Sequence, residues 1–124
     1  MQFQEKYTLF LKKNSMTLEQ WKAGGSYYGY QQHQIFVREE GVGETLLLIH
    51  GFPTASWDWQ QLWPKLVEKY HVISPDLLGF GFSDKPRNYL YSILDQANMI
   101  EALLQLKNIE RAKIISHDYG DTVA

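Results

Sequence analysis

Short apolar runs separated by turn-forming residues recur along the chain and predict β-strands. Thr45 to Ile49 is the clearest of them, because a continuous uncharged run is typical of a strand buried on both faces of a parallel sheet. Two shorter runs precede it, and Glu40-Gly41-Val42-Gly43 forms a turn after the second. The expected strands are 27–32, 34–38, 45–49, 71–74 and 113–117.

Apolar residues at helical spacing predict helices between these strands. One helix begins after Ser92, a favourable N-cap, and ends near Asn108; its apolar face consists of Ile93, Ala97, Ile100 and Leu104. An earlier helix is expected after the run 45–49, with Ser56 as its cap. Because Pro64 cannot lie deep inside one helix, we expect a break there and a second helical segment opened by this proline. A last helix begins at Tyr119.

The order of these elements predicts the fold class. Two strands are followed by three strands that alternate with helices, which is the pattern of an α/β domain with a mostly parallel sheet and flanking helices. We assign this domain to residues 24–124. Between the strand 71–74 and the helix after Ser92, the segment 75–88 is expected to be a long loop, because its turn-forming residues are Pro75, Gly79, Gly81 and Pro86.

Residues 1–23 differ from the rest and are expected to form an N-terminal extension with a short helix. Thr17-Leu18-Glu19-Gln20 resembles a capping box and predicts a helix start. Met16 lies directly before it, so we hypothesise that translation begins there and that residues 1–15 are an extension of the annotated sequence. An intact mass of the natural protein that includes residues 1–15 would refute this.

Composition excludes several classes of partner. The net charge is −2 with interspersed charges, so we expect no nucleic-acid partner. The chain has no cysteine, which excludes disulfides and thiolate metal sites, and we expect no cofactor and no metal. No apolar run approaches the ~20 residues that cross a bilayer, and the N-terminus lacks a secretory signal. We therefore expect no membrane segment and a cytoplasmic protein; the oligomeric state stays open.

The candidate chemistry begins at Ser116-His117-Asp118-Tyr119-Gly120-Asp121. This stretch lies where a strand turns into a helix, and a small-x-nucleophile-x-Gly turn of this kind presents its central side chain to substrate. That side chain is the carboxylate of Asp118. A carboxylate at such a nucleophile elbow predicts attack on a carbon atom and an ester bond to the protein.

A second motif, His50-Gly51-Phe52-Pro53, follows the strand 45–49. Its glycine permits close approach of the backbone, and its proline fixes the direction of the turn. If this turn lies beside Asp118, the backbone N–H groups of Phe52 and Tyr119 can point at one developing oxyanion.

Three motifs in this order resemble the α/β-hydrolase superfamily, in the branch of epoxide hydrolases and haloalkane dehalogenases. They are HGFPTASWDW, LGFGFSDKPR and SHDYGD, with 68 residues between His50 and Asp118. The resemblance covers roughly residues 17 to 124 and implies the N-terminal half of an α/β-hydrolase core. It also implies that Asp118 is the nucleophile and that the amides of Phe52 and Tyr119 form the oxyanion hole.

The activity implied by the resemblance is epoxide hydrolase-like, on a small apolar substrate. Asp118 attacks an sp³ carbon to form an alkyl ester, and a histidine oriented by an acid then activates water to hydrolyse it. Neither that histidine nor that acid is found after Asp118 in this chain. The 124 residues alone are therefore expected to be inactive, and β-strand 113–117 is expected to lack a neighbour on its far edge.

Two other functions remain open. Haloalkane dehalogenases of this type commonly have Asn or Glu at the position of Phe52 and Trp at that of Tyr119, and the side-chain N–H groups of Asn and Trp hold the halide. Epoxide hydrolases often have Trp at position 119 and Gly at the position of Asp121. Because residues 52, 119 and 121 differ from those of both enzymes, one alternative is a non-catalytic relative that acts as a binding or interaction protein. The other alternative is a haloalkane dehalogenase-like hydrolase.

The other polar residues of these motifs favour structural roles. His117 is expected to point away from Asp118 and to be packed, because side chains alternate along a strand. We expect His50 to be a hydrogen-bonded turn residue and Asp76 to bind backbone amides of its own loop. Asp121 is expected in the first turn of the last helix.

Overall fold

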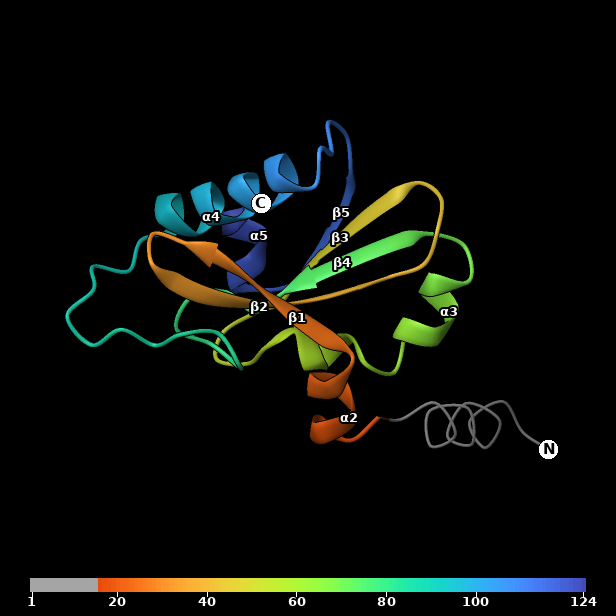
Figure 1. Ribbon diagram of the computed structural model, residues 1–124, viewed down its shortest axis with the longest axis horizontal. Coiled ribbons are helices and arrows are strands. Elements are labelled where there is room, and N and C mark those ends of the chain that lie inside the picture. Colours follow the sequence, from red (N-terminus) through yellow and green to blue (C-terminus); the bar gives the residue numbers. More distant parts are fainter. Residues whose placement is uncertain (1–15) are drawn as a thin grey trace.

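A five-stranded mixed sheet forms the centre of the computed structural model, which describes residues 16–124 (Figure 1). The sheet order is β1-β2-β4-β3-β5. β3 pairs in parallel with both β4 and β5, while β2 pairs antiparallel with β1 and β4. The elements are α2 (Leu18–Ala23), β1 (Gly25–Tyr30), β2 (His33–Glu40), β3 (Thr45–Ile49), η1 (Ser56–Trp59), α3 (Trp63–Val67), β4 (His71–Pro75), α4 (Ile93–Leu106), β5 (Lys113–Ser116) and α5 (Tyr119–Val123).

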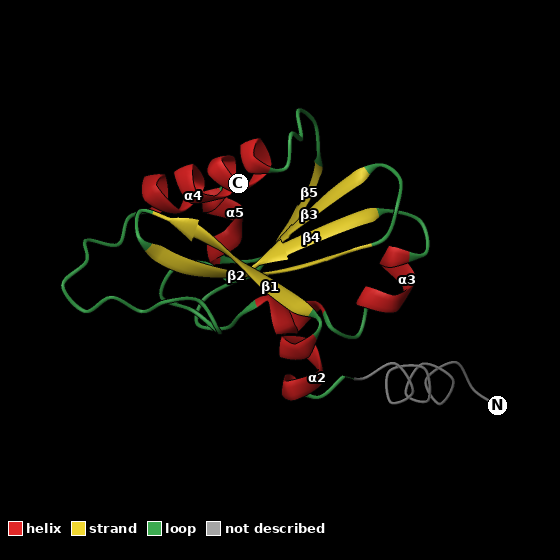
Figure 2. Cartoon of the chain, viewed as in Figure 1, coloured by secondary structure: helices red, strands yellow, loops and turns green. Residues whose placement is uncertain are grey.

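The two faces of the sheet bury separate apolar clusters, which confirms the expected burial of 45–49 on both sides. Leu47 and Ile49 face a cluster that includes Met99 and Leu103 of α4. The alternate residues of β3, Leu46 and Leu48, pack instead with aromatic side chains, among them Trp21, Phe36 and Trp63. Figure 2 shows α4 and α5 on one side of the strands and α2 and α3 on the other. Period-2 alternation along β3 thus places one helical layer on each face.

The hairpin of β1 and β2 is shifted from its expected position. The prediction that Gln32 belongs to the first strand is wrong: Tyr30 pairs with His33, and Gln31 and Gln32 form the turn between them. Both glutamines have positive φ angles, 47° and 68°. Two-residue hairpin loops commonly need such angles to match strand twist, but they usually contain Asn or Gly. The Gln31-Gln32 pair contains neither residue, so the sequence did not indicate a turn at this position.

Several helix boundaries confirm the predicted caps. Thr17 forms the complete capping box with Gln20 at the start of α2. Ser92 accepts the N–H of Asp95 at the start of α4, and Asn108, just beyond the end of this helix, has φ 56°. Pro64 lies at the start of α3, as expected for a second helical segment. The predicted start at Met16 concerns residues 1–15, which lie outside the described residues.

Ser56 does not act as the predicted cap. Ala55 occupies the N-cap position of η1 without a side-chain bond, and Ser56 is fully buried as the first residue of this short 3₁₀ helix. Its hydroxyl accepts the indole N–H of Trp21 at 3.0 Å, and its own N–H donates to Asp76 at 2.7 Å. A long-range contact between α2 and η1 therefore uses the hydroxyl that local sequence assigned to capping.

The last strand, β5, lies at an edge of the sheet. Its two isoleucines, Ile114 and Ile115, remain 47% and 42% exposed. It ends at Ser116, one residue earlier than expected, and β4 ends one residue later, at Pro75. Among residues 16–124, no helix is long and apolar enough to cross a membrane.

Candidate active site

Asp118 lies in a tight turn between β5 and α5. Its φ and ψ angles are 53° and −116°, a conformation that residues with a side chain rarely adopt. Its carboxylate does not cap α5 but accepts the N–H of Phe52, with 3.2 Å between Phe52 N and Asp118 Oδ2. The side chain is exposed. The strained backbone therefore presents a free carboxylate beside the turn that follows β3.

Two glycines allow these turns to meet. A Cβ atom on Gly51 would lie 2.9 Å from Asp118 Cβ and 3.0 Å from the carbonyl oxygen of His117. A Cβ atom on Gly120 would lie 2.6 Å from the carbonyl oxygens of both Ile49 and His50. Contacts this close are not tolerated by real side chains, so only glycine permits the two backbones to pack together at these positions.

Tyr119 begins α5 directly after the carboxylate. Its N–H lies in the first turn of the helix, where backbone N–H groups lack a partner inside the helix. Within residues 16–124 this N–H makes no hydrogen bond. The phenol ring packs against Phe80 at 5.9 Å between ring centroids, and burial raises the pKa of Tyr119 above its ordinary value. Of the two amides expected to form the oxyanion hole, that of Phe52 is bonded to the Asp118 carboxylate, and that of Tyr119 is unbonded and follows Asp118 directly in the chain.

His50 is fully buried and uses both ring nitrogens in the backbone of neighbouring loops. Its Nε2 accepts the N–H of Leu77 at 2.9 Å, so its Nδ1 carries the proton and donates to the carbonyl oxygen of Gly51 at 2.8 Å. Burial lowers the pKa of His50 below 6.5, although the Gly51 carbonyl and nearby carboxylates oppose that shift. A neutral imidazole with no free nitrogen fits the predicted turn residue.

The lowered pKa of His50 gives an acid dependence of stability. The unfolded chain binds a proton at His50 below about pH 6.5, whereas the folded protein resists it. This contribution to the free energy of unfolding is complete above pH 6.5 and falls as the pH decreases below that value. We expect urea unfolding between pH 8 and 5 to show this slope, His50→Gln to remove it, and His33→Gln, at a partly exposed position, to keep it. An unchanged slope in His50→Gln would contradict the assignment.

Asp76 organises the loop beside His50, as expected. Its carboxylate is buried and accepts the N–H of Ser56 at 2.7 Å and that of Phe82 at 2.8 Å. Its carbonyl oxygen accepts the hydroxyl of Ser83 at 2.6 Å. Asp76 therefore joins η1 to the loop after β4. In residues 16–124, no three His, Asp or Glu side chains are grouped to hold a metal ion.

An open pocket of about 490 Å³ adjoins the Asp118 turn. Aromatic and apolar residues dominate its lining, which consists of Phe52, Pro53, Leu78, Gly79, Phe80, Tyr91, Gln96 and Tyr119. The only amide side chain among them, Gln96, is satisfied by the backbone N–H and carbonyl of Leu78. No charged residue lines the pocket. This composition suits a small apolar ligand that contacts Phe52, Phe80 and Tyr119.

Similarity to a protein-family model identifies the family of this chain. Residues 44–124 match the model of the α/β-hydrolase fold family. The chain belongs to the α/β-hydrolase fold family. This confirms the predicted superfamily and fold class, with the sheet order and the two motif turns described above.

Relatives of this hydrolase-family chain include the mesoderm-specific transcript homolog protein of Bos taurus. It is 46% identical over 117 residues, which cover 89% of this chain and 35% of that protein. An uncharacterized hydrolase of Saccharomyces cerevisiae is 40% identical over 92 residues, which cover 73% of this chain and 32% of that protein. The chain thus spans about a third of the length of these curated relatives. Within the superfamily, the motifs HGFPTASWDW, LGFGFSDKPR and SHDYGD also predicted a likeness to mesoderm-specific transcript proteins, and the 46% identity confirms it.

Solved structures agree with this placement. An α/β-hydrolase fold protein from Burkholderia ambifaria superposes with a TM-score of 0.75 at 35% identity, covering 79% of this chain and 36% of that one. A loop variant of a haloalkane dehalogenase from Bradyrhizobium elkanii gives a TM-score of 0.74 at 31% identity, covering 80% and 33%. The branch suggested by the motifs therefore includes structural neighbours of this hydrolase-family chain.

The prediction for Asp121, near Asp118, is confirmed, whereas that for His117 is not. His117 is exposed, so the prediction that it is packed is wrong; it borders a smaller pocket of about 240 Å³ with Asp58. The strand ends before His117, so strand alternation no longer determines its side. Asp121 lies in the first turn of α5, as expected, and also accepts the hydroxyl of Ser116 at 2.6 Å.

Sequence reasoning missed the residues that complete the pocket. Phe80, Tyr91 and Gln96 come from the loop after β4 and from the first turn of α4. The loop has no periodic pattern, so only its Gly79 and Gly81 signalled a turn. Gln96 was one polar residue in a helix, and nothing local indicates its bonds to Leu78, 18 residues away.

Proposed function

We propose that this chain carries the nucleophile of an epoxide hydrolase-like enzyme that forms an ester at Asp118. The observation that supports it most is the 3.2 Å hydrogen bond from Phe52 N–H to the exposed Asp118 carboxylate, at a turn with positive φ. A capping or structural aspartate needs no such backbone strain. The two residues whose amides would form the oxyanion hole, Phe52 and Tyr119, both line the adjoining apolar pocket, and the N–H of Tyr119 makes no hydrogen bond within residues 16–124.

The first step is attack by a carboxylate oxygen of Asp118 on an epoxide carbon. A new C–O bond forms to the protein, the ring C–O bond breaks, and its electron pair stays on the former ring oxygen, which takes a proton from solvent or a nearby donor. In the second step water adds to the ester carbonyl of Asp118. The amides of Phe52 and Tyr119 donate to the resulting oxyanion before the diol leaves and the carboxylate is restored.

Activation of that water needs a general base. His50 does not fit, because both of its nitrogens are bound to backbone and its pKa is lowered by burial. The family mechanism uses a histidine and an acid beyond the nucleophile, and the chain spans about a third of its relatives' length. We assign the base to that histidine, so the 124 residues by themselves form the ester without hydrolysing it.

The pocket favours an uncharged apolar substrate. Two of its three polar side chains are occupied: Gln96 binds Leu78, and the hydroxyl of Tyr91 donates to the carbonyl oxygen of Pro86 at 2.7 Å. Phe52, Phe80 and Tyr119 form a continuous aromatic surface in the lining. A polar substrate group that does not reach the Tyr119 hydroxyl would lose its water without compensation, whereas a phenyl or alkyl group would not.

Intact mass spectrometry of the 124-residue chain with styrene oxide tests the proposal. We expect one added substrate mass, stable for hours, with the adduct located at Asp118 by peptide mapping. The physical reason is that ester formation needs only the carboxylate and the pocket, while its hydrolysis needs a base. A chain that stays unmodified, or an adduct spread over other carboxylates, would refute the nucleophile.

A second candidate is haloalkane dehalogenation by the same carboxylate. The solved haloalkane dehalogenase that superposes on this chain supports it. The identity of residue 52 opposes it, because the phenylalanine side chain has no N–H to hold a halide. The same mass experiment with 1-bromohexane separates the two: an alkyl ester and released bromide favour dehalogenation, and modification by the epoxide alone favours epoxide opening. Modification by neither supports the non-catalytic relative.

A further inference from the structure

Asp95, in the first turn of α4, binds two tyrosine hydroxyls from different parts of the chain. Tyr30, at the end of β1, donates to Asp95 Oδ1 at 2.7 Å. Tyr89, in the loop before α4, donates to Asp95 Oδ2. The backbone N–H of Asp95 donates to the Ser92 hydroxyl at 3.0 Å. One carboxylate therefore connects the β1–β2 hairpin, the loop 85–92 and the start of α4.

Tyr89, the loop residue that binds Asp95, also contacts a residue of the pocket lining. The Tyr89 ring packs edge-on against Tyr91, with 5.2 Å between centroids, and against His33 at 5.4 Å. Tyr91 lines the pocket and lies over Gly79, where an added Cβ would approach its ring to 2.8 Å. Residues 85–92 contain no helix or strand. The Tyr89–Asp95 bond is thus a main tether between this irregular wall and the helix.

The next residue of α4 bonds a second segment of the pocket lining. Gln96 is buried and bonds the N–H of Leu78 at 3.1 Å and its carbonyl oxygen at 2.8 Å. Leu78 and Gly79 follow β4 and line the pocket together with Tyr91, whose ring lies over Gly79. One turn of α4 therefore bonds two segments of the connection between β4 and α4, which contains no helix or strand of its own.

We propose that Asp95 is a positioning residue that sets the width of the pocket by tethering the Tyr91 wall through Tyr89. Substrate selection by the pocket rests on the proposed function, but the tether itself does not. With the tether intact, Tyr91 is held on Gly79 and the pocket accepts a flat apolar group. Without the tether, the Tyr91 wall moves. The kcat/KM of substrates that contact Tyr91 then falls more than the kcat/KM of substrates too small to reach it.

The titration of the two phenols agrees with this arrangement. Hydrogen bonding to Asp95, with burial and its negative charge, raises the pKa of Tyr89 to about 12. Burial, followed by the same carboxylate, raises the pKa of Tyr30 to about 12. The groups that face these phenols are Asp95, Tyr91 and His33. Of the two phenols, Tyr89 reports on the tether, because the hydrogen bond to Asp95 is the largest cause of its raised pKa.

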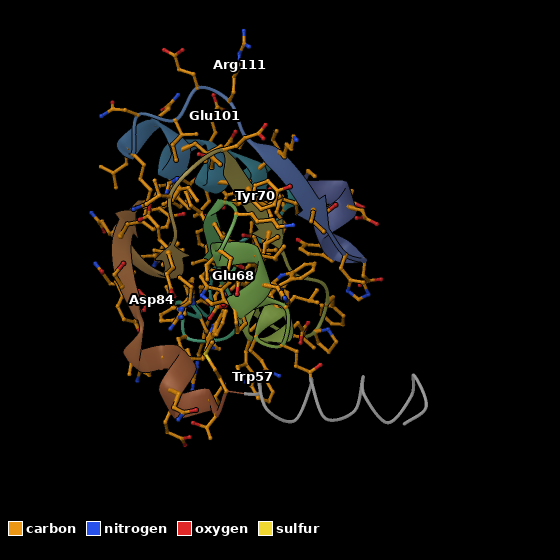
Figure 3. All side chains as sticks on the ribbon, turned by 90° about the vertical axis from the view of Figure 1, so that its right-hand side faces the viewer. Trp57, Glu68, Tyr70, Asp84, Glu101 and Arg111 are labelled. Atoms are coloured by element: carbon orange, nitrogen blue, oxygen red, sulfur yellow. The ribbon has the colours of Figure 1, made fainter. Side chains whose placement is uncertain are left out.

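Three variants test the proposal. Asp95→Ala removes both bonds, Tyr89→Phe removes only the arm to the loop, and Glu101→Ala removes an exposed carboxylate from the same helix as a control. Figure 3 shows Glu101 at the end of the molecule opposite Trp57. Hydrogen exchange of residues 85–92 and the kcat/KM ratio of styrene oxide to 1,2-epoxypropane are measured in the intact enzyme. Binding of 1-phenyl-1,2-ethanediol, the expected product, is measured by NMR.

We expect Asp95→Ala and Tyr89→Phe to speed exchange of residues 85–92 and to lower the substrate ratio about tenfold, mainly through KM for styrene oxide. In Asp95→Ala the pKa of Tyr89 should fall from about 12 towards 10, because its bond to Asp95 is the largest cause of the raised value, while Glu101→Ala leaves every readout unchanged. If Asp95→Ala does not fold, Tyr89→Phe decides. Unchanged exchange, or faster exchange with an unchanged substrate ratio, overturns the proposal.

The failure of the proposed function gives a different result. If the unsubstituted enzyme turns over neither epoxide, the activity is refuted, and the tether is then judged on exchange and diol binding alone. Weaker diol binding in Tyr89→Phe but not in Glu101→Ala supports it. Equal binding in all variants overturns it.

Discussion

Replacing Asp118 with Asn is expected to abolish ester formation and to lower turnover of styrene oxide in the intact enzyme by about 10³-fold or more. Asn keeps the size of the side chain and tolerates the positive φ of 53° that the turn imposes, so the fold should survive. It lacks the negative charge and the nucleophilic oxygen pair. Steady-state kinetics and intact mass with the epoxide measure the two losses.

Asp121→Asn is the matched control for this prediction. Asp121 lies three residues away in the same turn and accepts the Ser116 hydroxyl, so its replacement removes an equal charge from the same surface. We expect it to keep the covalent adduct and most of the activity. If Asp118→Asn retained turnover, Asp118 would not be the nucleophile. If both variants lost turnover equally, the negative charge of this region and not a nucleophile would explain the activity.

Sequence patterns predicted the parts of this fold that depend on local chemistry. The continuous apolar run of β3, the capping box at Thr17, the Ser92 cap and the break at Pro64 each follow from residues within a few positions. The resemblance of the motifs to α/β-hydrolases also implied that Phe52 lies near Asp118, and the hydrogen bond between them shows that contact. The catalytic roles of Asp118, Phe52 and Tyr119 stay predictions.

What the sequence did not predict depends on distant contacts. Ser56 satisfies a local rule for caps, yet the indole of Trp21 and the carboxylate of Asp76 use its polar groups instead. The Gln31-Gln32 turn adopts positive φ without the residues that usually signal it, since pairing of β1 with β2 determines its geometry. Local propensity is a weak constraint where tertiary contacts oppose it.

The pocket shows the same limit at the site itself. Part of its lining comes from the connection between β4 and α4, and Asp95 and Gln96 bond two segments of this connection from a helix that periodicity described only as amphipathic. A pair of polar residues at the start of a helix gives no sign of which segment it will bind. Only the folded arrangement shows that one helical turn bonds both segments.

Gly120→Ala is expected to destabilise the protein by about 3 kcal/mol or more, because it is an overpacking change against backbone. The new Cβ would lie 2.6 Å from the carbonyl oxygens of Ile49 and His50, and neither can move without disturbing β3 or its following turn. Relief requires the Asp118 turn to separate from the Phe52 turn. Activity should therefore fall along with the free energy of unfolding, measured by urea denaturation of the intact enzyme.

Gly29→Ala separates this steric effect from the general effect of replacing glycine. Gly29 lies in β1 at a position where an added Cβ meets nothing within 4 Å, so the change should be nearly neutral or slightly stabilising, since alanine restricts the unfolded chain. A Gly120→Ala variant as stable as Gly29→Ala would show that the two turns do not approach as closely as described. The arrangement of Phe52 N–H at the Asp118 carboxylate depends on that approach, so the same result would also remove the geometric basis of the proposed nucleophile.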